Sequence, residues 1–183
     1  LYVNLFVASE LNWKERKMVL RQQTAFPYAE TSNIEVTKGK GVFTLKIRKP
    51  LWCDNFTVKG VGFVVDSYEE NGFVCIKRKW KKGDQVEISI PMHAYIKPMI
   101  NVPQYVAIMY GPILLGMKSG TEDMRSLIAD DSRFGQYADG MKLPLDKAPI
   151  LLPKHLNDIA KDLKPIPDKP LHFKLATHME NVI

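Results

Sequence analysis

The stretch Phe43-Thr44-Leu45-Lys46-Ile47-Arg48 decides the fold class, because it alternates apolar and polar side chains without a break. Successive side chains of a β-strand point to opposite faces of the sheet, so the apolar residues share one face and the polar residues the other. The pattern predicts a strand that is buried on one side only. Pro50 ends this strand, because proline cannot donate a hydrogen bond to a neighbouring strand.

The residues that follow repeat this pattern. Asn71-Gly72 is typical of a tight hairpin turn, and it leads into a strand over residues 73–80 in which Val74, Ile76 and Trp80 share one face. Lys82-Gly83-Asp84 predicts a reversal into a further alternating segment over residues 86–90. Many short strands with Gly and Pro between them are typical of all-β proteins. We therefore predict an all-β fold, an antiparallel β-sandwich of jelly-roll-like type.

The chain divides into two regions by its residue pattern and composition. Residues 1–118 carry the strand patterns and are predicted to form the core of the sandwich. Within them, residues 9–14 predict a turn or a single helical turn. Residues 119–183 are richer in proline and acidic residues, so we expect an irregular C-terminal extension there. This extension is predicted to hold a short helix near residues 158–164 and a strand at 171–176 that returns to the sheet.

The composition is that of an ordinary globular protein, with 183 residues, 45% hydrophobic and 25% charged. The longest apolar run, around residues 113–115, is too short to cross a bilayer. The formal net charge is +6, and the densest basic stretch is Lys77–Lys82. Because no RNA-binding aromatic signature and no basic helix accompany it, we interpret this stretch as a solvated strand edge and predict no nucleic-acid partner.

No stretch combines a nucleophile with a base, or several metal ligands at a suitable spacing. The acidic pairs Glu69-Glu70 and Asp130-Asp131 are adjacent residues, which point to opposite faces of a strand, so we interpret them as turn and loop acids. Lone histidines are more often structural than catalytic, and this interpretation applies to His93, His155, His172 and His178. We predict no catalytic, cofactor-binding or metal-binding residue in this chain.

Cysteine and tryptophan leave alternatives open. Cys53 and Cys75 are either paired across neighbouring strands or are two small buried side chains, and no compartment follows from them. Trp13 and Trp52 are candidates for a contact with a sugar or with a neighbouring domain, because a flat exposed ring stacks on a sugar face. Burial against the sheet is the alternative for both. Trp80 shares its face with apolar neighbours and is predicted to be a core residue.

Three stretches and the opening residues together resemble one known family. They are FTLKIRKPLW at 43–52, GFVCIKRKWKKGD at 72–84, YGPILL at 110–115 and the opening LYVNLF at 1–6. Their order and spacing resemble the C-terminal β region of glycoside hydrolase family 127, which is typified by β-L-arabinofuranosidases. The resemblance covers residues 1–118 well and the remainder only loosely, through the closing segment at 170–173.

The resemblance implies that the chemistry of such an enzyme lies in an N-terminal α/α barrel. In the family that barrel holds a cysteine nucleophile, a zinc ion bound by cysteines and a glutamate, and a glutamate acid/base. The Cys-Cys-Pro element of this centre comes shortly before the position that matches Leu1. We therefore expect this chain to be a fragment that begins just after the catalytic machinery and is inactive alone. Cys53 and Cys75 match none of the catalytic cysteines, so zinc is expected only in the barrel.

Three functions follow as hypotheses. The first is a non-catalytic accessory β-sandwich that braces the barrel of the same parent chain. The second is an independent carbohydrate-binding module that uses Trp13 or Trp52 to bind arabinose-containing or other plant-type glycans. The third is a purely structural domain.

Overall fold

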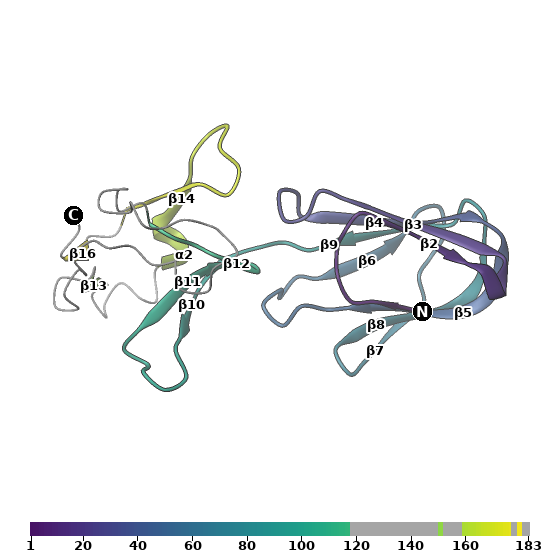
Figure 1. Cartoon of the computed structure of the whole chain (residues 1–183), viewed down its shortest axis with the longest axis horizontal. Helices are drawn as coiled ribbons and strands as arrows, with labels where there is room; N and C mark the ends of the chain where they lie inside the picture. Colours follow the sequence, from purple (N-terminus) through teal and green to yellow (C-terminus); the bar gives the residue numbers. More distant parts are fainter. Residues whose placement is uncertain (118–149, 152–158, 177–178, 181–183) are drawn as a thin grey trace, which may run out of the picture.

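The computed structural model describes residues 1–117, 150–151, 159–176 and 179–180, and two β-sheets dominate it (Figure 1). The first sheet has five strands, in the order β2 (Ser9–Trp13), β3 (Met18–Thr24), β4 (Thr31–Lys38), β9 (Gln85–Ser89) and β6 (Thr57–Gly60). The second has four strands, in the order β1 (Tyr2–Val3), β5 (Lys40–Arg48), β8 (Phe73–Lys81) and β7 (Ser67–Glu70). Neighbouring strands are antiparallel, except that β1 pairs with β5 in parallel. The all-β, sandwich-like fold is confirmed.

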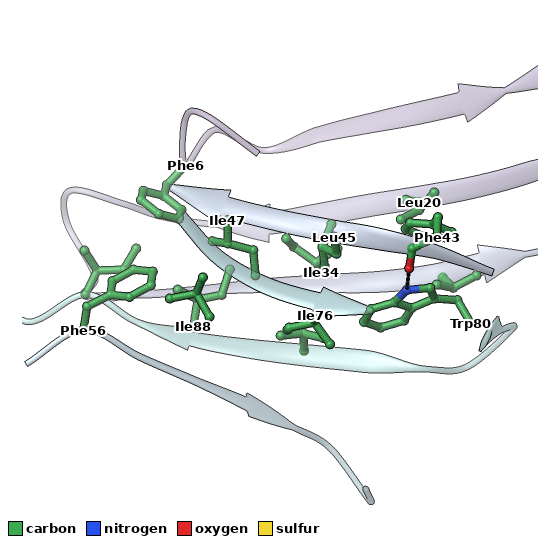
Figure 2. Packing of buried hydrophobic residues seen from close by; sticks show 14 of the residues in the cluster. Phe6, Leu20, Ile34, Phe43, Leu45, Ile47, Phe56, Ile76, Trp80 and Ile88 are labelled. Carbon is green, nitrogen blue, oxygen red and sulfur yellow. Dashed lines mark hydrogen bonds between the residues drawn. The ribbon is translucent and has the colours of Figure 1, made fainter. Parts of the chain in front are cut away.

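The core lies between the two sheets and is built by alternate side chains of both (Figure 2). On β5 the alternation is as predicted, because Phe43, Leu45 and Ile47 are buried while the residues between them are only half-buried. Side chains of both sheets complete the cluster, among them Met18, Leu20, Ile34, Val36, Val74, Ile76, Trp80, Val86, Ile88 and Ile90. Trp80 is 2% exposed, so its assignment to the core is confirmed.

The turn at Asn71-Gly72 forms the predicted hairpin between β7 and β8. Asn71 has φ of 51° and Gly72 has φ of 78°. Two consecutive left-handed residues match the right-handed twist of the flanking strands, which is why Asn-Gly is favoured at this position. The sequence therefore specifies this turn locally.

The reversal at Lys82-Gly83-Asp84 is also present, but it carries the chain from one sheet to the other. β8 belongs to the four-stranded sheet, whereas β9 pairs with β4 and β6 in the five-stranded sheet. The buried carboxylate of Asp84 holds this crossing. It accepts a hydrogen bond from the Lys81 backbone N–H at 2.9 Å and lies 3.4 Å from the Arg78 guanidinium.

The turn predicted at residues 9–14 is wrong. Ser9–Trp13 form β2, and only Lys14–Arg16 make a single 3₁₀ turn, named η1. β2 is the outermost strand of its sheet and pairs with β3 from Ser9 opposite Gln22 to Trp13 opposite Met18. Four of its five side chains are exposed, so the strand has no buried face to produce an alternating pattern.

The chain beyond residue 92 forms smaller elements that lie to the left of the two large sheets in Figure 1. β10 (Ala94–Pro98), β11 (Val106–Tyr110) and β12 (Ile113–Leu114) form an antiparallel sheet. Two two-stranded sheets and one short helix follow. β13 (Ile150–Leu151) pairs with β16 (Met179–Glu180), β14 (Leu163–Pro165) pairs with β15 (Phe173–Leu175), and the helix is α2 (Ile159–Asp162).

Three sequence predictions concern this second part. The strand expected to return to the sheet is β15, which pairs with β14 and with neither large sheet. The division of the chain at residue 118 stays a prediction. Asp130-Asp131, His155 and His178 lie outside the described residues. Within the described ranges, no helix has the length and apolar character needed to cross a membrane.

Candidate functional surfaces

Trp13, the last residue of β2, is half-buried at one end of the sandwich. Its ring meets Phe43 edge to face, with centroids 5.5 Å apart, and the Arg16 guanidinium lies 4.7 Å from the ring centroid. Arg16 is held in place by a hydrogen bond from its Nη1 to the Val42 carbonyl oxygen at 2.8 Å. A sugar that stacked on this ring would compete with the guanidinium for a ring face.

Trp52 lies at the other end of the core. Its ring is stacked on Phe26, with centroids 6.3 Å apart and planes at 7°, and Phe26 in turn contacts Phe6. Figure 2 shows Phe6 and Phe56 at one end of the core and Phe43 and Trp80 at the other. The two predicted tryptophans are therefore not brought together. Their contact with a sugar or a domain stays a prediction.

A hollow of about 370 Å³ lies beside the segment on either side of Trp52 in the sequence, and it is lined by Lys49, Pro50, Leu51, Cys53, Asp54, Glu69 and Gly72. Its cysteine is not poised for nucleophilic chemistry. Cys53 is buried, and its thiol donates a hydrogen bond to the Pro91 carbonyl oxygen at 3.4 Å. Burial raises the pKa of the Cys53 thiol, and the nearby Asp54 carboxylate acts in the same direction. The thiolate, which is the reactive form, is thereby disfavoured. Leu51 at the rim is fully exposed.

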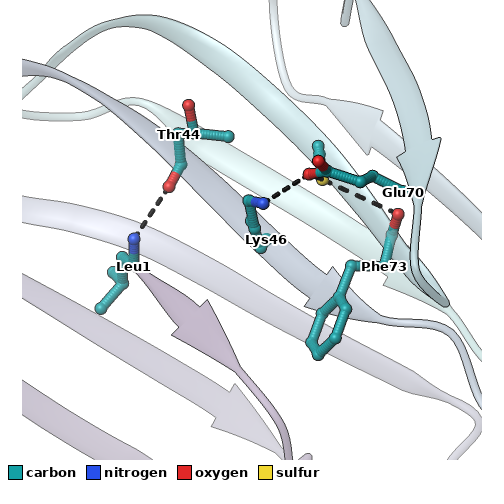
Figure 3. Close-up of polar contacts among 6 residues, drawn as sticks. Leu1, Thr44, Lys46, Glu70 and Phe73 are labelled. Carbon is teal, nitrogen blue, oxygen red and sulfur yellow. Dashed lines mark hydrogen bonds and ion pairs between the residues drawn. The ribbon is translucent and has the colours of Figure 1, made fainter.

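The paired acids Glu69 and Glu70 bind different lysines. Glu69 accepts from Lys49 Nζ at 2.8 Å, and Glu70 accepts from Lys46 Nζ (Figure 3). The hydrogen bond to Glu70 is the main cause that raises the pKa of Lys46. The two carboxylates are thus separate surface ion pairs, as expected for adjacent strand residues, and are not arranged as a catalytic pair.

The outer face of the four-stranded sheet carries a row of four residues across its strands. The register places Tyr2 beside Lys46, Lys46 beside Cys75 and Cys75 beside Tyr68. The Cys75 thiol is completely buried, 3.9 Å from Glu70 Oε2, and Phe73 meets the Tyr2 ring edge to face. Cys53 and Cys75 are both free, so of the two alternatives left open by the sequence the structure shows two buried thiols.

A second hollow, of about 210 Å³, lies where residues 1–5 pass the edge of the five-stranded sheet, beside Leu11, Leu20 and Ile34. Three of its lining residues, Tyr2, Leu5 and Leu11, are 59%, 70% and 40% exposed, and Val7, two residues after Leu5, is 58% exposed. Sequence reasoning missed this surface, because the sequence does not show which apolar side chains the fold leaves uncovered. Only their placement at the outside of the sandwich shows that they are uncovered.

Glu30 is a further residue that sequence reasoning missed. Its Oε1 accepts a hydrogen bond from the Met92 backbone N–H at 3.0 Å and one from the Tyr110 hydroxyl at 3.5 Å. Its carbonyl oxygen accepts from the Ile90 N–H at 2.8 Å. Burial raises the pKa of Tyr110, and the Glu30 carboxylate adds to the effect. Glu30 therefore ties the loop between β3 and β4 to β11, across 80 residues of sequence.

Within the ranges that the structure describes, no group of three or more His, Cys, Asp or Glu side chains is placed to hold a metal ion. Cys53 and Cys75 donate to structural acceptors, and they lie on different elements. The described residues do not fit the zinc site that the resemblance implies for the barrel.

Comparison with known proteins identifies two matched regions. A family model described as the beta-L-arabinofuranosidase GH127 middle domain matches residues 1–92, which is half of the chain. A second model, described as a domain of unknown function, matches residues 95–182. No curated protein matches the chain.

Solved structures of glycoside hydrolases are similar to the chain. One is a GH127 beta-arabinofuranosidase, with 33% identity and a TM-score of 0.54, covering 62% of this chain and 22% of the other. Another is a GH127 beta-L-arabinofuranosidase from Geobacillus stearothermophilus T6, with 30% identity, a TM-score of 0.54 and coverage of 62% and 19%. A structure described only as a glycoside hydrolase is 27% identical, with a TM-score of 0.54 and coverage of 62% and 20%. The chain spans about one fifth of the length of these structures.

Proposed function

The chain belongs to glycoside hydrolase family 127, and on this premise we propose that it is a non-catalytic accessory region that braces the α/α-barrel catalytic domain of a β-L-arabinofuranosidase-like enzyme. About four fifths of each matched structure lies outside the region that this chain covers. In an enzyme of that kind, the barrel is the natural neighbour of the sandwich.

The apolar surface around the 210 Å³ hollow carries this proposal. Soluble proteins rarely leave contiguous apolar surface uncovered, and such a patch marks a contact with another protein surface. The patch combines Tyr2, Leu5, Val7 and Leu11 with the apolar lining of the hollow. We assign the barrel domain as its cover.

The first test is an activity measurement. The purified chain is incubated with aryl β-L-arabinofuranosides, with the Geobacillus stearothermophilus enzyme as the positive control. No hydrolysis is expected, because the acids and thiols described above are held in structural contacts. Hydrolysis by the chain alone would overturn the accessory role.

The second test addresses the surface. The chain is fused to a GH127 barrel, and the thermal stability of the barrel is compared between the parent fusion and a variant with Leu5→Gln and Val7→Gln. The barrel is expected to lose stability in the variant. The matched control is Leu114→Gln, an exposed leucine of β12. Equal loss in the control would contradict the assigned contact.

A second candidate, the carbohydrate-binding module, is favoured by one observation at Trp52. Its ring is half-buried and backed by the stacked Phe26 ring, which makes a rigid aromatic platform. Calorimetry with arabinan is expected to show binding that Trp52→Ala abolishes. Trp13→Ala serves as the comparison, since Arg16 already lies over the Trp13 ring. If neither the barrel contact nor glycan binding is found, the purely structural role is left.

A further inference from the structure

The outward face of the four-stranded sheet gathers most of its basic side chains. The pairs Gly41–Trp80 and Leu45–Ile76 point into the core, so the pairs between them along β5 and β8 point outward. Those outward pairs place Lys40 opposite Lys81, Val42 opposite Lys79 and Thr44 opposite Lys77. We call this surface the cationic face, and its members are Lys40, Lys46, Arg48, Lys77, Lys79 and Lys81.

The charge of the cationic face is largely uncompensated. Among the described residues, the only ion pair on this face joins Lys46 to Glu70. Lys40 lies directly opposite Lys81 on adjacent strands, an arrangement of like charges that destabilises a sheet. The lysines at positions 77, 79 and 81 repeat roughly every 7 Å along one face of β8. A linear anion laid along the strand would relieve this repulsion.

Strand-edge protection explains only part of this pattern. β7 reaches only to Ile76, so residues 77–81 of β8 do border an open edge, where lysines discourage pairing with another sheet. Lys46, however, lies on β5 between two partner strands, with Tyr2 of β1 on one side and Cys75 of β8 on the other. The charge therefore extends across the face of the sheet and away from that edge.

Aromatic rings accompany the charge. Tyr2 and Tyr68 lie on the same outward row as Lys46, and both are more than half exposed. The Lys46 Nζ lies 5.5 Å from the centroid of the Tyr2 ring. Exposed aromatic rings beside ammonium groups suit a sugar chain that bears carboxylates, because the rings stack on sugar faces and the ammonium groups bind the acids.

We propose that the cationic face binds an acidic polysaccharide built of uronic acid residues. The carboxylates would pair with Lys77, Lys79 and Lys81 along β8, and a sugar face would contact Tyr68, whereas Tyr2 belongs to the patch assigned to the barrel domain. This inference rests on the proposed function in one respect, the choice of a glycan as the anion. It adds a binding site on a face distinct from the Trp52 platform.

The test is affinity electrophoresis and calorimetry of the chain with polygalacturonate at low and at moderate salt. Binding is expected, and it should weaken as salt rises, because exposed ion pairs are screened. Fully methyl-esterified polygalacturonate, which lacks the charge, is expected not to bind. Absence of polygalacturonate binding would overturn the proposal.

Two triple variants with the same net charge locate the site. Lys77→Gln/Lys79→Gln/Lys81→Gln is expected to weaken binding by on the order of tenfold, since each exposed ion pair is individually weak and three are removed. The matched control is Lys97→Gln/Lys164→Gln/Lys174→Gln, which removes exposed strand lysines of the second part. Equal weakening in the control would show that net charge alone is responsible and would overturn the site.

Two further binding measurements decide the chemical class of the anion. Duplex DNA that binds as tightly as polygalacturonate would overturn the choice of a sugar chain, and weaker DNA binding supports it. Tyr68→Ala leaves the charge unchanged and is expected to weaken polygalacturonate binding. Unchanged binding in this variant would also overturn the choice of a sugar chain. Hydrolysis of arabinofuranosides by the chain would overturn the proposed function but would leave these binding results standing.

Discussion

The indole of Trp80 donates a hydrogen bond to the carbonyl oxygen of Phe43 at 3.1 Å, and the two rings stack with centroids 5.6 Å apart (Figure 2). The contact joins β8 to β5 diagonally within the core, because the register places Trp80 opposite Gly41, two residues before Phe43. A buried indole N–H needs such an acceptor, because an unpaired buried donor is destabilising. One side chain thus supplies both apolar burial and the polar partner that makes the burial favourable.

Trp80→Phe is expected to lower the free energy of unfolding by about 2–3 kcal/mol, because it leaves a cavity and removes the donor to Phe43. Urea unfolding followed by circular dichroism measures the change. Trp13→Phe is the comparison, since Trp13 packs on the same Phe43 ring but is half-buried. A smaller loss is expected there, and equal losses would contradict the central place of Trp80 in the core.

Gly72→Ala is expected to destabilise the fold by about 1–2 kcal/mol, because φ of 78° is unfavourable for any side chain. Apart from the two adjoining residues, no part of the described structure lies within 4 Å of the added methyl group, so the effect is backbone strain alone. Gly116→Ala is the matched control, where the added methyl group is also unopposed. Thermal unfolding of both variants measures the difference, and a neutral Gly72→Ala would contradict the left-handed turn.

Glu30→Ala is expected to loosen the junction that Glu30 forms with Met92 and Tyr110. The Met92 N–H loses its acceptor, which destabilises this junction by about 1–2 kcal/mol. Limited proteolysis should then cleave the segment around residues 90–94 faster than in the parent chain. Glu30→Gln keeps an acceptor oxygen at the same position and is expected to show a smaller effect. Equal rates of cleavage in all three proteins would show that Glu30 does not hold the junction.

The raised pKa of Tyr110 predicts a loss of stability at alkaline pH. Burial and the Glu30 carboxylate raise the pKa of the folded Tyr110 above its ordinary value of 10.0, so the unfolded chain loses this proton more readily. The stabilising contribution is complete below that ordinary value and is lost as the pH rises through the folded pKa. Urea midpoints of the parent chain should therefore fall more steeply above about pH 10 than those of Tyr110→Phe. Parallel curves would rule out this contribution, because every other ionisable group is common to both proteins.

Local patterns predicted the strands with one buried face. The alternation at residues 43–48 and the Asn71-Gly72 turn each require only neighbouring residues, since the direction of a side chain and the sign of the backbone φ angle are set within a few positions. β2 was not predicted, because its exposed side chains leave no such pattern and its only support is pairing with β3.

Arg78 shows why the basic stretch could not be read as one surface. It belongs to the run Lys77–Lys82, yet it points inward, with its guanidinium 3.6 Å from the Phe63 ring centroid and 3.4 Å from Asp84. Neither partner is its neighbour in the sequence. The lysines on either side point outward, where β5 adds Lys40 and Lys46 to the cationic face.

The sequence by itself determined the all-β class, the hairpin of β7 and β8 and the core position of Trp80, since each depends on patterns within short stretches. It also indicated the family, through the order and spacing of four such stretches. Tertiary structure alone decided that β8 and β9 lie in different sheets and that Glu30 meets Tyr110. It also decided that Trp13 contacts Phe43 at one end of the core, while Trp52 stacks on Phe26 beside Phe6 at the other. The physical reason is that a turn specifies a reversal but not the strand that will accept the next hydrogen bonds. Those partners are chosen by burial of apolar faces between residues that lie far apart in the chain.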